Sequence, residues 1–194
     1  STLLWCIVLR RVSELGGSPF YEDALMAQSM SKEYWKLLIY EFNNRDFAYL
    51  SIGTAAQKLP GSPRAEFFKA YFELEVLTRE IYTNYQDVLG YDHQQSWITP
   101  IRAWAAELYV RFFNRKDASL ATTVIIPYLP KLEKLRDLSD PAHKEFFDYI
   151  IAQETAQLEA AQATEGGNWL AGAKVFRAFV REHEVLRPSP IGDS

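Results

Sequence analysis

Helix-breaking residues divide this sequence at intervals, and between them the apolar residues recur with the 3.6-residue period of an α-helix. The breaks stand at Gly16-Gly17, Pro60-Gly61, Gly90 and Gly166-Gly167. A half-exposed strand would instead alternate apolar and polar residues with a period of two. The pattern therefore predicts an all-α protein without a sheet.

The starts of the helices can be placed as well, because several capping side chains are followed by proline at the first helical position. Such pairs are Ser18-Pro19, Ser62-Pro63, Thr99-Pro100 and Asp140-Pro141. Short connections between helices favour antiparallel neighbours in a bundle. The predicted helical segments are a first one ending near residue 15, then 19–30, 31–59, 63–89, 100–113, 118–138, 141–163 and 168–186. We expect a single helical domain of seven or eight helices over residues 1–186 and a flexible C-terminal tail over residues 187–194.

Two of these helices contain residues that disturb helical geometry. Pro127 and Pro130 fall inside the segment 118–138, and proline removes a backbone donor and clashes with the preceding turn. We therefore expect a kink there, beside a central pocket. Gly53 is expected to mark a bend in the long segment 31–59.

The charge and cysteine content exclude several classes of protein. With 21 basic and 25 acidic residues the chain is too evenly charged for a nucleic-acid-binding protein. The longest apolar run, residues 3–9, is too short to span a membrane, and the lone Cys6 cannot form an internal disulfide. We expect a soluble, cytoplasmic protein that binds neither nucleic acid nor membrane. Because the chain starts at Ser1 inside an apolar segment, we also expect further residues upstream.

Histidines do not form a recognisable metal motif in this sequence. His93, His143 and His183 lie far apart, and none belongs to a two-histidine helical motif. Polar residues near helix ends are the simpler interpretation.

Carboxylates are more suggestive of a site. Glu73 and Glu80 are seven residues apart on one stripe of a helix, and inward-facing carboxylates of bundles hold metals or ligands. The alternative is a solvated face on which these residues pair with Lys69 or Arg79. Both interpretations stay open at this point.

Aromatic residues are abundant, with 11 Tyr, 12 Phe and 5 Trp. They make a large core, and some of them could line a pocket for a flat, largely apolar ligand held by phenolic hydroxyls and carboxylates.

Five stretches follow one another in a familiar order: Ser18-Pro19-Phe20, residues 31–42, residues 73–80, Ile125-Ile126-Pro127-Tyr128 and Asp140-Pro141-Ala142-His143. This order resembles the heme-oxygenase-like superfamily, in particular the TenA (thiaminase II) branch with its relatives PqqC and the CADD-like di-iron oxidases. The resemblance implies a heme-oxygenase-like bundle with a central pocket.

Departures from these families limit the chemistry that the resemblance implies. Tyr128 stands where TenA enzymes have their nucleophilic cysteine, and Val175 stands near their catalytic glutamate. Ile150 and Gln157 stand where the di-iron oxidases have histidine ligands, and no histidine precedes His93 to ligate heme. We therefore expect no thiaminase activity, no bound iron, and neither cofactor nor metal.

Two functions remain. One is an enzyme, or a divergent former enzyme, that acts on a small aromatic or heterocyclic metabolite. The other is a non-catalytic binding or scaffolding protein that kept the fold and forms a homo-oligomer, such as a dimer, through its aromatic helices. A cavity of roughly 300 Å³ or more would favour the ligand, and a closed, dry centre would favour the scaffold. The candidate ligand-binding residues are Tyr40, Asp46, Glu73, Glu80, Tyr128 and Glu154.

Overall fold

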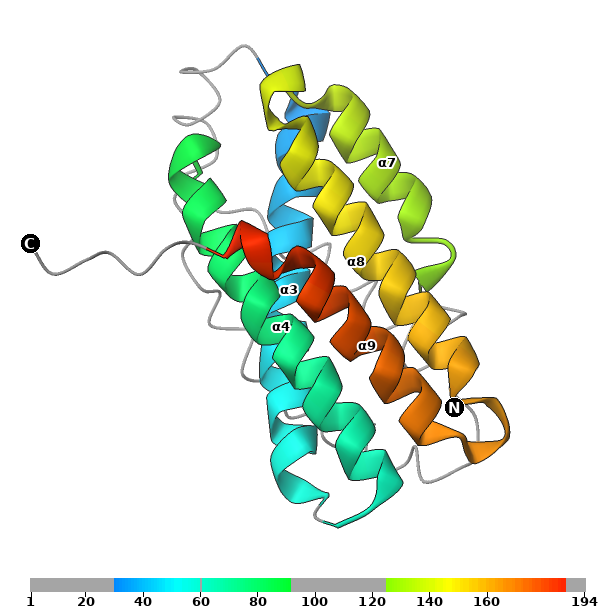
Figure 1. The fold of residues 1–194 in the computed structure, drawn as a ribbon. Helices are drawn as coiled ribbons and strands as arrows, with labels where there is room; N and C mark the ends of the chain where they lie inside the picture. The colour runs from blue at the N-terminus through cyan, green and yellow to red at the C-terminus, as the bar shows by residue number, and fades with distance from the viewer. Residues whose placement is uncertain (1–29, 60, 92–124, 188–194) are drawn as a thin grey trace, which may run out of the picture.

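The computed structural model describes residues 30–59, 61–91 and 125–187, and these residues form helices without any strand. The all-α prediction is therefore confirmed for this part of the chain (Figure 1). The helices expected before residue 30 and over 100–113 lie outside the described residues, as does most of the predicted tail. The α-helices are α3 (Lys32–Lys58), α4 (Pro63–Val88), α7 (Leu129–Leu138), α8 (Lys144–Ala163) and α9 (Trp169–His183).

Capping side chains set the starts of four described helical segments, close to where the sequence predicts them. The side-chain oxygens of Ser31, Ser62 and Asn168 each accept a hydrogen bond from the backbone N–H three residues further on, at 3.1, 3.1 and 3.4 Å. Asp140 accepts from the Ala142 N–H at 2.8 Å and begins the 3-10 turn Pro141–His143, which leads into α8. Each bond satisfies a backbone donor that the helix itself leaves unpaired.

The predicted interruption near Pro127 and Pro130 is present, as a break. A turn at residues 126–128 separates the helical residue Ile125 from α7, and Pro130 lies in the first turn of α7, where its missing N–H costs no hydrogen bond. The turn places Tyr128 against the core, with 8% of its surface exposed.

The helix α3 continues through Gly53 to Lys58 without a break. A Cβ atom at this position would lie 2.8 Å from the ring of Phe72 on α4. Glycine therefore lets α3 and α4 approach closely, which is a packing requirement at this position.

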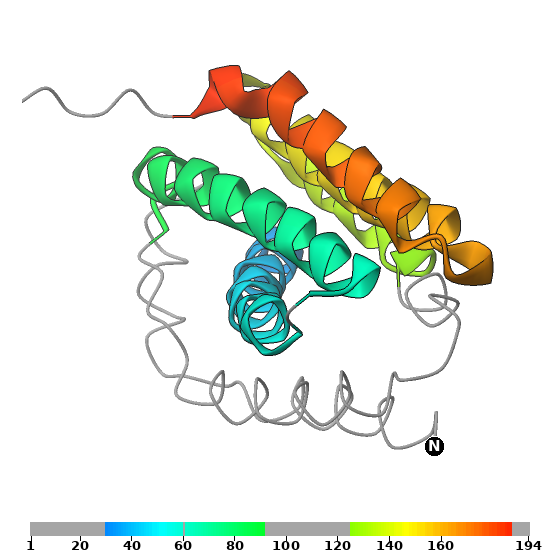
Figure 2. The ribbon, with the colours of Figure 1, turned by 60° about the horizontal axis from the view of Figure 1, so that its bottom comes forward.

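The five α-helices form a closed ring (Figures 1 and 2). In order around it, α3 packs on α4, α4 on α9, α9 on α8, α8 on α7, and α7 again on α3. Figure 1 shows that α3 and α4 run antiparallel, as do α8 and α9. Within the described ranges, no helix combines the length and the apolar character that a membrane crossing requires.

Large apolar side chains fill most of the interior of this ring. Phe42 of α3, Leu74 of α4, Phe146 of α8 and Phe176 of α9 are each at most 2% exposed. Aromatic contacts link the helices, as between Tyr71 and Phe176, whose rings stack at 4.6 Å. This packing surrounds a group of polar side chains at the centre.

Candidate functional site

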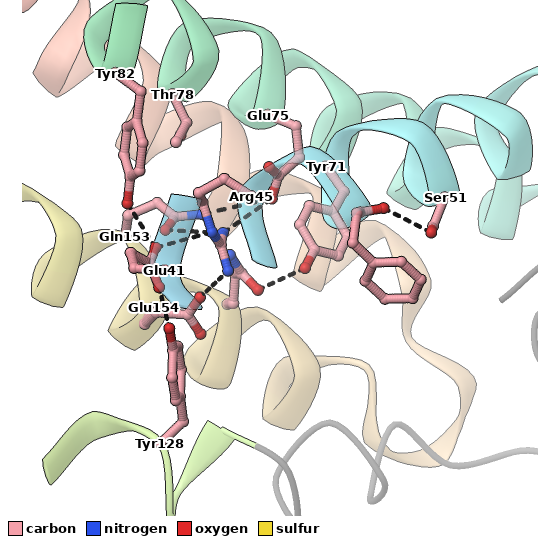
Figure 3. Close-up of polar contacts among 12 residues, drawn as sticks. Glu41, Arg45, Ser51, Tyr71, Glu75, Thr78, Tyr82, Tyr128, Gln153 and Glu154 are labelled. Carbon is pink, nitrogen blue, oxygen red and sulfur yellow. Dashed lines mark hydrogen bonds and ion pairs between the residues drawn. The ribbon is translucent and has the colours of Figure 1, made fainter. Parts of the chain in front are cut away.

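Arg45 is the centre of this buried polar group (Figure 3). It lies three residues after Phe42 and seven after Leu38, so that helical geometry places it on the same inward-facing stripe of α3. Only 7% of its surface is exposed. A buried guanidinium requires charged and hydrogen-bonding partners, and here they come from three helices.

Three glutamates surround the guanidinium group. Its Nε lies 3.1 Å from Oε1 of Glu41, one turn earlier on α3. Its Nη1 lies 3.4 Å from Oε1 of Glu75 on α4 and donates to Oε1 of Gln153 on α8 at 3.1 Å. Its Nη2 donates to Oε1 of Glu154, also on α8. Arg45 thus connects α3, α4 and α8 across the interior of the ring, and we call these five residues the Arg45 cluster.

Two tyrosines complete the surroundings of Glu41. The hydroxyl of Tyr82 on α4 donates to Oε1 of Glu41 at 2.6 Å, and the hydroxyl of Tyr128 donates to Oε2. Burial, and next the charge of Glu41, raise the pKa of both tyrosines well above the ordinary value, so both stay protonated donors. Further buried polar contacts are Gln153 Nε2 to Glu75 at 3.5 Å, Thr78 with Tyr149 at 2.8 Å, and Tyr71 to Gln157 at 2.5 Å.

The Arg45 cluster contains more acid than base. Fully ionised, its three carboxylates and one guanidinium carry two excess negative charges, and the carboxylates are only 0%, 1% and 2% exposed. Burial raises the pKa of both Glu75 and Glu154 from 4.5 to about 7, although Arg45 acts in the opposite direction. Burial lowers the pKa of Arg45, but Glu154, Glu41 and Glu75 overcome that effect and raise it well above the ordinary value. Burial therefore brings the pKa of Glu75 and Glu154 close to neutral pH.

A cavity of about 220 Å³ lies between α3 and α4, beside the Arg45 cluster. This volume is smaller than the roughly 300 Å³ that we expect for a typical ligand pocket. Among the described residues its aromatic lining is Phe42, Tyr49 and Tyr82. Its charged lining is Arg45, Asp46, Glu75 and Arg79. Glu75 and Arg45 therefore belong both to the cluster and to the pocket wall.

Four of the six residues predicted to bind a ligand lie in or near this region. Glu154 belongs to the Arg45 cluster, Tyr128 donates a hydrogen bond to its Glu41, and the ring of Tyr40 lies 5.7 Å from that of Tyr128. Asp46 lines the pocket.

The other two predicted ligand-binding residues, Glu73 and Glu80, do not lie at this site. The side chains of Glu73 and Glu80 are 49% and 40% exposed, and they pair with Arg177 at 3.5 Å and Arg187 at 2.7 Å. The expectation that they point into the bundle is wrong, and the open alternative of a solvated, ion-paired face is correct, with arginines of the C-terminal region as the partners. The inward carboxylate of α4 is Glu75, two residues after Glu73.

Arg45, Glu41, Glu75 and Gln153 were not predicted as site residues, whereas Glu154 was, although the sequence contains a signal for Arg45 and Gln153 as well. Arg45 continues the buried stripe of Leu38 and Phe42 on α3. Gln153 and Glu154 likewise follow Ile150, one turn earlier on the buried face of α8. A charged residue that continues a buried stripe at helical spacing is a candidate for a buried ion pair.

Ile150 and Gln157, which stand where the di-iron oxidases have histidine ligands, make contacts within the protein. Ile150 is buried in the core, and Gln157 accepts a hydrogen bond from Tyr71. Over the ranges that the structure covers, no three or more His, Cys, Asp or Glu side chains are grouped so that they could hold a metal ion. The cation at the meeting point of the three glutamates is the guanidinium of Arg45.

Comparison with known proteins identifies no relative of this chain. No protein-family model matches the sequence, and no curated protein and no solved structure matches it. The assignment of function therefore depends on the physical chemistry of the Arg45 cluster and its pocket.

Proposed function

We propose that the protein binds a small aromatic or heterocyclic metabolite in the pocket between α3 and α4, with Glu75 placed to exchange a proton with it. The observation that carries the proposal is the position of Glu75. Its carboxyl group is fully buried, yet it forms part of the wall of a cavity. A buried acid without a role costs stability, and buried titratable groups in clefts mark functional sites.

The size and lining of the pocket favour a one-ring compound. A cavity of about 150 Å³ is enough to hold benzene, so about 220 Å³ has room for a single ring with one or two substituents. Phe42, Tyr49 and Tyr82 offer ring faces and edges for stacking. Arg45 and Glu75 supply fixed polar contacts on the inner wall.

Proton exchange at Glu75 makes acid-base chemistry available. The pKa of its carboxyl group, raised by burial to about 7, matches what a general acid or base needs near neutral pH. On this basis we propose a divergent enzyme of the heme-oxygenase-like superfamily. The all-helical ring and the break before α7 are consistent with that fold.

Blocking the pocket tests the proposal. Thr83 lines the pocket from an exposed position on α4, so Thr83→Trp should fill the pocket without disturbing the core. Asn84→Trp is the matched control, since Asn84 is exposed on the same helix and does not line the cavity. Native mass spectrometry should detect a small copurified compound in the wild type and in Asn84→Trp and should not detect it in Thr83→Trp. Equal ligand content in all three proteins would refute the assignment of the site.

The scaffolding function is the second candidate, because one observation favours it. Arg45 and its partners occupy the polar centre of the ring, and the cavity beside them is smaller than 300 Å³. On this alternative, the protein associates as a homodimer through its aromatic helices and binds no metabolite. A ligand-free dimer in native mass spectra, with no compound that shifts the melting temperature, would favour it over the first.

A further inference from the structure

The charge of the ligand can be inferred from the wall of the pocket. Arg45 does not neutralise its surroundings, because one guanidinium faces Glu41, Glu75 and Glu154. All three carboxylates are buried, so water screens them little. Of the three, Glu75 lines the pocket, as does Arg45. Because Glu41 and Glu154 also pair with this guanidinium, the negative charge of Glu75 is only partly neutralised and can act on a ligand.

The other charged residues that line the pocket within the described part of the chain do not change this balance. Asp46 and Arg79 both line it and have opposite signs. The guanidinium of Arg79 lies over the ring of Tyr49, 4.4 Å from its centroid, on an exposed part of α4. Phe42 and Tyr82 add aromatic surface, and ring faces attract cations. Excess negative charge and aromatic walls both favour a positively charged ligand.

We propose that the pocket between α3 and α4 selects a single-ring organic cation, such as an amidinium or a ring-nitrogen base bound as its conjugate acid, through the carboxylate of Glu75, which shares the one guanidinium of Arg45 with Glu41 and Glu154. This inference rests on the proposed function. A bound cation would supply the second positive charge that the Arg45 cluster lacks, and buried charges are stable when they are paired.

Three probes of nearly equal shape isolate the effect of charge. Benzamidine is positively charged, benzamide is neutral and benzoate is negatively charged. Isothermal titration calorimetry at pH 8 should give a Kd for benzamidine that is at least about tenfold below that for benzamide, with benzoate the weakest. Glu75→Gln should remove most of this preference. Glu133→Gln, the same chemical change at an exposed position on α7, should retain it.

The outcomes separate this inference from the proposed function. If benzamide and benzamidine bind equally well to the wild type and neither binds to Thr83→Trp, the pocket is confirmed as the binding site. The proposal that it selects a cation is then overturned. If benzamidine binds equally to Thr83→Trp and to the wild type, it binds elsewhere and the inference is wrong. If none of the three probes binds to the wild type, the proposed selection of a cation is wrong and the scaffolding function is favoured over the binding of a metabolite. A circular dichroism spectrum checks that each variant is folded.

Discussion

Replacing Glu75 by glutamine should change stability in a way that depends on pH. Glutamine has nearly the shape of a protonated glutamate, and its amide oxygen can still accept from Arg45 and Gln153, as Oε1 of Glu75 does. The substitution therefore removes the negative charge and keeps most contacts. Its effect on the free energy of unfolding measures the cost of that buried charge.

The expected magnitude follows from the pKa of Glu75. Burial raises this pKa from 4.5 to about 7, and a tenfold change in proton affinity corresponds to about 1.4 kcal/mol. Ionising Glu75 in the folded protein therefore costs about 3 kcal/mol more than in the unfolded chain. The folded state binds the proton more tightly, so the stabilisation is complete below pH 4.5 and is lost as the pH rises to about 7. Glu75→Gln should thus be up to about 3 kcal/mol more stable than the wild type at pH 8.5 and within ~1 kcal/mol of it at pH 5.

Urea unfolding at these two pH values is the assay, and Glu73→Gln is the matched control. Glu73 lies two residues earlier on α4, is half-exposed, and pairs with Arg177, so its substitution should change stability by less than ~0.5 kcal/mol at either pH. If Glu75→Gln were clearly less stable than the wild type at pH 8.5, Arg45 would be stabilising an ionised Glu75. The account of an excess acid in the cluster would then be refuted.

Three other substitutions each test a single contact inside the ring of helices. Arg45→Met should cost about 3 to 5 kcal/mol at pH 8 in urea unfolding, and less at pH 5, where Glu75 and Glu154 are protonated. Tyr128→Phe removes one of two hydroxyl donors to Glu41 and should cost about 1 to 3 kcal/mol, and an unchanged urea midpoint would exclude this hydrogen bond. Gly172→Ala should cost about 1 to 3 kcal/mol because its Cβ would lie 2.7 Å from the backbone oxygen of Ala160; a variant as stable as the wild type in thermal unfolding would contradict the close contact of α8 and α9.

Helix boundaries were predictable from the sequence because they depend on local interactions. Ser31, Ser62 and Asn168 satisfy N–H groups only three residues away, and Asp140 does so two residues away. A pattern of neighbouring residues contains all the information that such a cap requires. The role of Gly53 was not predictable in this way, because it depends on Phe72 of another helix.

The site was predicted less well, since the inward direction of a helix depends on its neighbours. α4 packs on both α3 and α9, so Glu73 and Glu75 each lie beside a helix, yet only Glu75 faces the interior of the ring. The seven-residue spacing of Glu73 and Glu80 fixes that they share a face, but it does not fix which face is buried. Arg45 was missed because arginine on a helix is usually exposed, and its burial depends on carboxylates from α4 and α8 far along the sequence.

A pH titration of the Glu75 carboxyl carbon by NMR, with and without benzamidine, tests directly whether Glu75 is a buried acid that a bound cation can pair with. The Glu75→Gln variant assigns the resonance. We expect a midpoint near pH 7 in the free protein, because burial raises the pKa of Glu75 to about 7, and a midpoint at least about one pH unit lower with benzamidine bound, because a cation in the pocket favours the carboxylate. A midpoint below pH 5 in the free protein, or one that saturating benzamidine leaves unchanged, would contradict the account.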